Sequence, residues 1–338
     1  MRHRAQTLAG MDDESLLALR FRDLELPHGT GMVALHVRRL YRELAGRGIR
    51  FRPHWWYAEE WFSPDGVPGI AVPFYLANPR LMRLERRLMH QVEGGNSTWL
   101  MRILRHEAGH ALDTAFGLRR RKDWRRVFGR PSERYPVDYT PRPASRRYVL
   151  HLGHWYAQSH PTEDFAETFA VWLQPRARWR REYAGWPALK KLEFVDTLMA
   201  EVARRRPVRS ARRELEPVAR SRRTLAQHYR YKGKRYVMED GRYDRALRRM
   251  FRTVPSRRHA LAAAFLRQTR PQIERLLVRR ARLHPYVVRH ALDILMQRCS
   301  EMHLYLRRDR RRAKRDFLGL VQRVVLDILN RNRENYAL

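Results

Sequence analysis

Two histidines and a glutamate in the segment LRHEAGHALD, residues 104–113, have the residue types and the spacing for metal chemistry. Positions i and i+4 of a helix lie on the same face, so His106 and His110 would project together, with Glu107 at the edge of that face. Two imidazoles can bind a divalent metal ion while the neighbouring carboxylate handles protons. The surrounding leucines and alanines make these polar side chains costly to bury without such a role. The segment therefore predicts a metal site beside a candidate general base, Glu107.

A catalytic zinc site takes a third protein ligand and leaves one position open for water. The segment PTEDFAETFAVWLQP, residues 161–175, places Glu163 and Glu167 four residues apart, on one face of a second helix. We expect Glu163 to bind the metal and Glu167 to accept a hydrogen bond from a metal-binding histidine. The reverse assignment of the two glutamates remains open at this point.

Other polar residues near the two helices are candidates for supporting roles. Asp113 continues the first helix three residues past His110, so it would point away from the metal and support the site from outside the ligand set or hold a loop. The segment HLGHWYAQSH offers alternative third ligands, although an ordinary polar contact is the simpler interpretation of each of its histidines: His151, His154 and His160.

The elements that must position these residues follow from the hydrophobic pattern. Capping residues at 96–98 and Gly117 delimit a helix over 96–118, and prolines delimit the second helix over 161–175. Residues 70–77 alternate as a strand, and Pro73 confines it to a sheet edge. We also expect a helix over 31–48, a strand within 49–62 and a long loop over 119–150.

The chain changes in character after about residue 205. We expect a hairpin at 228–238 and helices between 255 and 330. The fold class is thus α+β: a domain of residues 1–205 with a small mixed sheet and an active-site helix, followed by a basic, mainly helical region of residues 206–338.

The composition limits the class of protein. The 338 residues contain 43% hydrophobic side chains, enough for a packed core, and the single cysteine, Cys299, excludes an intramolecular disulfide. No secretory signal and no membrane-spanning run is visible, which predicts a cytoplasmic protein. The net charge of +36 is nearly all arginine. It indicates either affinity for nucleic acid or another polyanion, or a compositional bias, and the charge alone does not separate the two.

The motifs carry a resemblance to known peptidases. HExxH on one helix followed by ExxxE on another resembles the gluzincin metallopeptidases, and YAQSHPTEDFAETF is similar to the lethal factor-like group. ILRHEAGHALD, VPGIAVPFYLANPRLMRLE, WYAQSHPTEDFAETFAVWL and AGWPALKKLEFVD are similar to a bacterial family of zinc-binding metallopeptidases, over residues 15–200. The resemblance implies a zincin-like domain, one Zn²⁺ on His106, His110 and Glu163, and a catalytic Glu107. Tyr156 lies seven residues before the glutamate ligand, where the lethal factor-like enzymes have an assisting tyrosine.

These features predict a zinc peptidase that hydrolyses peptide bonds in a protein or peptide substrate, with no membrane partner and an unknown oligomeric state. Tyr156 is the first candidate for a donor to the tetrahedral oxyanion, with His154 and His160 as alternatives. The strand at 70–77 could pair with an extended substrate, with Ile70, Val72 and Phe74 along it. The alternative function is a nucleic-acid-associated protein whose zincin domain processes bound protein or acts as a switch. A third interpretation, a zinc site kept only for stability, leaves Glu107 without a use.

Overall fold

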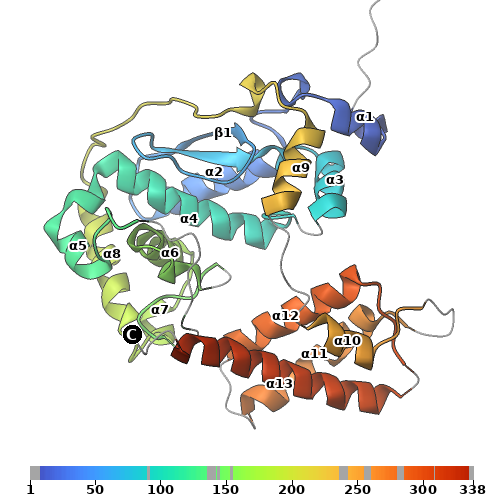
Figure 1. Ribbon diagram of the computed structural model, residues 1–338. Helices are drawn as coiled ribbons and strands as arrows, with labels where there is room; N and C mark the ends of the chain where they lie inside the picture. The colour runs from blue at the N-terminus through green and yellow to red at the C-terminus, as the bar shows by residue number, and fades with distance from the viewer. Residues whose placement is uncertain are drawn as a thin grey trace, which may run out of the picture. The chain divides into compact units, whose positions relative to one another are not determined.

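Helices α4 and α6 pack against each other at the centre of the part of the chain that carries the motifs (Figure 1). The computed structural model describes residues 8–89, 92–134, 142, 145–152, 155–235, 243–254, 260–279, 285–307 and 309–334. The chain divides into two compact units, one of Met1–Tyr139 and Arg146–Tyr236, the other of Thr140–Ser145 and Val237–Leu338.

The first unit combines helices with a very small sheet. Strands β1 (His54–Ala58) and β2 (Gly69–Pro73) pair in parallel, with His54 opposite Gly69 and Ala58 opposite Pro73. Its helices are α1 (Asp13–Ala18), α2 (Gly31–Gly46), α3 (Pro79–Met89), α4 (Ser97–Phe116), α5 (Lys122–Phe128), α6 (Pro161–Leu173), α7 (Trp179–Glu182), α8 (Ala188–Val202) and α9 (Leu225–Arg235). The α+β class expected from the sequence is confirmed at this level.

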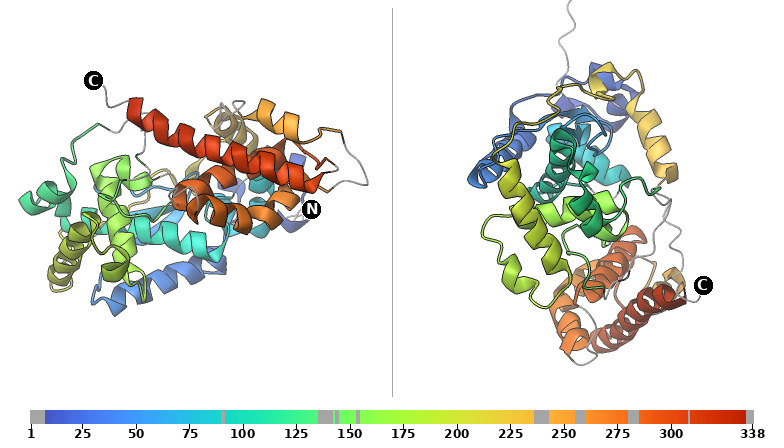
Figure 2. Two further views of the ribbon diagram at one scale, coloured as in Figure 1. Left: turned by 90° about the horizontal axis from the view of Figure 1, so that it is seen from below. Right: turned by 90° about the vertical axis from the view of Figure 1, so that its left-hand side faces the viewer.

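The second unit is helical over the residues that the structure describes. It contains α10 (Asp244–Met250), α11 (Ala262–Arg279), α12 (Pro285–Glu301) and α13 (Arg310–Glu334). Helices α11, α12 and α13 pack against one another, as the orange and red ribbons of Figures 1 and 2 show. Cys299 is buried, as expected for a small apolar residue. No helix in the described ranges combines the length and the apolar composition that crossing a membrane requires.

Two predicted elements near the sheet are wrong. The strand expected over 70–77 ends at Pro73, and Phe74–Ala77 form a 3-10 helix instead. The predicted loop over 119–150 contains α5, whose Trp124 and Phe128 are buried in the core. In both places tertiary burial of aromatic side chains outweighs the local pattern.

The predicted hairpin at 228–238 is also wrong for the residues that the structure describes, because 225–235 form helix α9. The alternation of tyrosines with basic residues suggested strands. The buried positions instead follow a helical spacing: Leu225, His228, Tyr229 and Lys232. Residues 206–235 pack with the first unit, whereas the sequence indicated a boundary near 205.

Candidate metal centre

Helix α4 is held in place by well-defined ends and an almost fully buried middle. Asn96 Oδ1 accepts a hydrogen bond from Trp99 N at 2.9 Å, which caps the first turn. Gly117, with φ of 63°, ends the helix in the left-handed conformation, where a residue without Cβ carries no steric penalty. Every residue from Ile103 to Phe116 is buried, so the histidines are fixed within a rigid core element.

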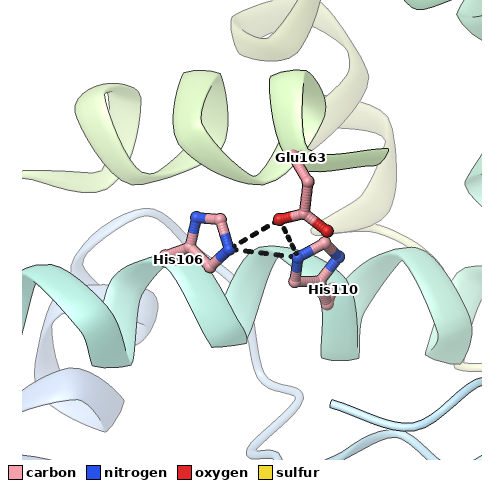
Figure 3. Close-up of side chains that lie close together, drawn as sticks. All are labelled: His106, His110 and Glu163. Carbon is pink, nitrogen blue, oxygen red and sulfur yellow. Dashed lines mark hydrogen bonds and ion pairs between the residues drawn. The ribbon is translucent and has the colours of Figure 1, made fainter. Parts of the chain in front are cut away.

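At Gly109, α4 lies in close contact with α6. A Cβ atom added there would lie 2.9 Å from Ala166 Cα and 3.3 Å from Ala166 O, both of them backbone atoms of α6. Only glycine permits this approach. The crossing brings Glu163, three residues before Ala166, over the two histidines of α4 (Figure 3).

The three side chains converge on one point. His106 Nε2 lies 3.1 Å from His110 Nε2 and 3.0 Å from Glu163 Oε2, and His110 Nε2 lies 3.1 Å from the same oxygen. All three residues are buried. The atoms form a nearly equilateral triangle with sides of 3.0–3.1 Å, so His106, His110 and Glu163 would together be able to hold one zinc ion. This geometry fits a zinc ion.

The pKa shifts of His106 and Glu163 both indicate that positive charge is favoured at this point. Burial lowers the pKa of His106, but the carboxylates of Glu163 and Glu167 outweigh it and hold that pKa well above its ordinary value. Burial raises the pKa of Glu163, but His110 and His106 outweigh it and hold that pKa well below its usual range. A buried carboxylate that stays charged beside two imidazoles is the donor set that zinc prefers.

Glu167 supports the site from behind His106. Its Oε1 accepts a hydrogen bond from His106 Nδ1 at 2.8 Å, and its Oε2 accepts one from Leu152 N at 2.8 Å. Both oxygens of Glu167 are therefore engaged away from His110. The geometry favours Glu163 over Glu167 as the metal ligand and leaves Glu167 to orient the imidazole.

Glu107 has the environment of a group that handles protons. Its Oε2 is buried and has no hydrogen-bond partner among the residues that the structure describes, and burial raises the pKa of its carboxyl group. The backbone carbonyl of Glu107 accepts a hydrogen bond from Ser63 Oγ at 3.1 Å, and this hydroxyl also contacts Gly69 O at 2.9 Å. Ser63 was not expected from the sequence, because SPDG has only the signature of a turn.

Tyr156 lies beside the centre, whereas His160 is engaged elsewhere. It begins a short 3-10 helix, Tyr156–Gln158, and its ring centroid is 5.6 Å from that of His106. His154 lies outside the described residues. His160 caps α6 instead: its Nδ1 accepts a hydrogen bond from Thr162 N at 3.2 Å and its Nε2 bonds to Glu133 O at 3.0 Å.

Two further candidates have structural partners. His151 Nε2 bonds to Arg102 O at 3.0 Å, so it is not placed as a ligand. Asp113 is fully buried and accepts hydrogen bonds from Arg119 N at 2.7 Å and Arg119 Nε at 2.5 Å. Of the two roles considered for Asp113, the structure favours holding the turn that follows α4.

The expected substrate strand is placed differently from the prediction. The side chains of Ile70, Val72 and Phe74 are at most 1% exposed and belong to the hydrophobic core, and Phe74 lies beyond the strand. The outer side of β2 is also covered, since Ala71 N donates to Phe62 O at 2.8 Å in an antiparallel bridge. β2 therefore does not present the open edge that the prediction required.

Comparison with known proteins gives one match. A family model described as "Putative zinc-binding metallo-peptidase" matches residues 85–182, under a third of the chain. This segment contains α4 and α6, and with them all three residues of the candidate metal centre. No curated protein and no solved structure gives a significant match. The match supports a relationship to zinc-binding metallopeptidases at the level of the family.

Proposed function

We propose that this protein is a zinc-dependent peptidase that hydrolyses peptide bonds with Glu107 as the general base. The observation that carries the proposal is the convergence of His106, His110 and Glu163 within 3.1 Å of one another, next to a glutamate with a buried, unpartnered oxygen. The matching family model supports the same class of activity. A purely structural zinc site has four protein ligands and no open position, and it needs no general base such as Glu107.

A bound zinc ion supplies a water of lowered pKa and polarises the carbonyl of the scissile bond. Glu107 accepts a proton from the attacking water and passes it to the leaving amine. The raised pKa of its carboxyl group suits the first step, because a carboxylate of higher pKa is a stronger base. Tyr156, beside His106, is the proposed hydrogen-bond donor to the developing oxyanion.

The arrangement of elements supports a zincin-like domain of the gluzincin type. The two histidines come from one helix and the glutamate from the next, with ExxxE placing Glu163 and Glu167 on one face of α6. We propose that an extended substrate pairs with the segment around Phe62, which forms an antiparallel bridge with Ala71 of β2. The hydrogen bond from Ser63 to the Glu107 carbonyl links this segment to the catalytic helix.

The proposal is tested by metal analysis together with cleavage of a peptide library. We expect one zinc ion per chain in the wild type, and loss of stoichiometric zinc in Glu163→Ala. Glu107→Gln should keep its zinc and lose at least about 100-fold in cleavage rate. Equal zinc content in wild type and Glu163→Ala, or undiminished cleavage by Glu107→Gln, would contradict the assignment.

A second candidate function is binding of nucleic acid by the second unit. The start of α13 presents a group of exposed basic side chains that suits a phosphate backbone: Arg307, Arg310, Arg311, Arg312 and Arg315. Retention on immobilised DNA should then fall steeply with salt, and Arg311→Glu/Arg315→Glu should reduce it. Retention unchanged by these substitutions would exclude α13 as the site.

A further inference from the structure

A basic hollow lies beside the end of the catalytic helix in the first unit. It has a volume of about 770 Å³ and is open to solvent. It is lined by Asp65, Arg119, Arg120, Lys122, Arg125, Arg126, Arg130, Pro131 and Ser132. Six of these nine residues are cationic and one is acidic, so the hollow is a strongly positive surface feature.

The carboxylate of Asp65 does not neutralise this hollow. Arg119 contacts Asp65 at 2.7 Å and Asp113 at 2.5 Å, so these two carboxylates are already engaged by one guanidinium group. The other five cations form no ion pair with a carboxylate of the described residues. Arg125 donates only to backbone carbonyls, at 2.7 Å to Arg120 O and 3.4 Å to Arg121 O, which leaves its charge uncompensated. Like charges held together in this way attract an anionic ligand.

Two short stretches of chain link residues of the hollow to residues of the candidate metal centre. Asp65 follows Ser63 by two residues, and the Ser63 hydroxyl contacts the carbonyl of Glu107. On the other side, Ser132 precedes Glu133, whose carbonyl accepts the hydrogen bond from His160, the cap of the helix that carries Glu163.

The distance from the metal centre suits a peptide that occupies both places. Six residues separate His110 from Phe116, the end of α4, which is about 9 Å at 1.5 Å per residue. The cationic residues begin three positions further along the chain, so the hollow starts roughly 10–20 Å from the ligands. An extended peptide covers about 3.3 Å per residue, so this span corresponds to about three to six residues.

We propose that the basic hollow binds the carboxylates of an acidic stretch in the peptide substrate, about three to six residues from the scissile bond. Guanidinium groups pair with carboxylates in a planar, two-point geometry, and several of them around one open hollow suit several carboxylates. The position beside the catalytic helix favours a substrate segment over an unrelated anion. This inference rests on the proposed peptidase function and adds the class of substrate.

The test compares two double variants. Each replaces two exposed arginines with glutamates, so both change the net charge by the same amount, but on different surfaces. Arg126→Glu/Arg130→Glu changes the hollow at two exposed arginines. Arg204→Glu/Arg205→Glu changes two exposed arginines elsewhere in the first unit and is the matched control. Each variant is made in the full chain, in the wild-type and in the Glu107→Gln background. The probes are labelled peptides with four glutamates on either side of a cleavable sequence, and the same peptides with four glutamines.

Binding is measured by fluorescence anisotropy with the Glu107→Gln protein, and cleavage with the zinc-loaded protein. We expect the glutamate peptides to bind about tenfold more tightly than the glutamine peptides at about 0.1 M salt. Arg126→Glu/Arg130→Glu should remove this preference, while the control keeps it within about twofold. Cleavage rates at low substrate concentration should follow the same order.

The outcomes separate the inference from the function on which it rests. Acidic-peptide binding that depends on Arg126 and Arg130, without cleavage of any peptide, would contradict the peptidase function and leave the ligand class intact. Cleavage without a preference for glutamate would contradict the inference alone. Equal loss in both variants, or tighter binding of an oligothymidylate of the same charge, would show a general polyanion surface and would overturn the proposal.

Discussion

The imidazole of His106 and the carboxylate of Glu167 form a buried pair in which Nδ1 and Oε1 are 2.8 Å apart. Glu167 is itself fixed by the amide of Leu152, which donates to its second oxygen. With Nδ1 engaged behind the ring, His106 directs Nε2 toward His110 and Glu163. Glu167 thus holds His106 in the orientation in which its Nε2 meets the other two candidate ligands.

Glu167→Gln is expected to lower zinc affinity by about 10–100-fold, because the amide keeps the shape of the side chain but not the charge that raises the basicity of His106. Competition with a chromogenic chelator measures the affinity. Cleavage should recover when zinc is added in excess. The exposed Glu193 provides the control, since Glu193→Gln removes the same charge from the surface of α8. Equal zinc affinity in both variants would rule out the supporting role of Glu167.

Tyr156→Phe is expected to reduce kcat by about 100-fold while leaving zinc content and KM nearly unchanged. The substitution keeps the ring that lies 5.6 Å from that of His106 and removes only the proposed oxyanion donor, whose loss typically costs this much. Tyr231→Phe, at a 56% exposed tyrosine of α9, is the matched control. If both variants turn over at the wild-type rate, the donor must be sought elsewhere.

The grouping of His106, His110 and Glu163 could be predicted from the sequence because its signals are local. The spacing of His106 and His110 defines one helix face, and Asn96 and Gly117 mark the ends of that helix. Glu163 and Glu167 are four residues apart, and this spacing likewise puts them on one face of a single helix. The spacing could not show how α4 and α6 contact each other. That contact places Glu163 against His110 and Glu167 against Nδ1 of His106.

Some other elements of the fold could not be predicted because they depend on distant partners. The segment containing Lys232 was expected to form a hairpin, yet it is a helix whose Lys232 ammonium group is buried against Glu85 at 3.0 Å. Similarly, the alternation through Phe74 indicated a continuous strand. Whether such segments become strands or helices depends on the surfaces that cover them, and the sequence gives no local signal for those surfaces.

His151 is expected to make the protein less stable at acidic pH. Burial lowers the pKa of His151 to about 4, from 6.5 in an exposed chain. Above pH 6.5 both the folded and the unfolded state carry a neutral ring. Between pH 6.5 and 4 the unfolded chain binds a proton that the folded chain does not, so the free energy of unfolding falls as the pH falls. The loss is about 1.4 kcal/mol per pH unit, or about 2 kcal/mol at pH 5.

His151→Gln isolates this contribution, because its amide can still donate to Arg102 O but does not titrate. Urea denaturation of both proteins at pH 7.5 and pH 5, in the presence of a chelator, gives the four free energies of unfolding. The wild type should lose about 2 kcal/mol more than the variant between the two pH values. A difference near zero would mean that His151 is protonated in the folded protein, in conflict with its burial.

Gly109→Ala is expected to damage both the fold and the metal centre. The added methyl group would meet the backbone of Ala166 at 2.9 Å, and backbone atoms cannot move aside as the end of a side chain can. Separating α4 from α6 should lower the free energy of unfolding by about 1–3 kcal/mol, the usual cost of overpacking. Zinc affinity should fall as well, because the same displacement carries Glu163 away from the histidines.

The control for this prediction is Gly46→Ala at the end of α2, where a Cβ atom would have no neighbour within 4 Å. Chemical denaturation and chelator competition on both variants separate the loss of stability from the loss of zinc. Substitution at Gly46 should leave both quantities close to the wild type. If Gly109→Ala binds zinc as tightly as the Gly46 variant, the close crossing of the two helices is not what assembles the three ligands.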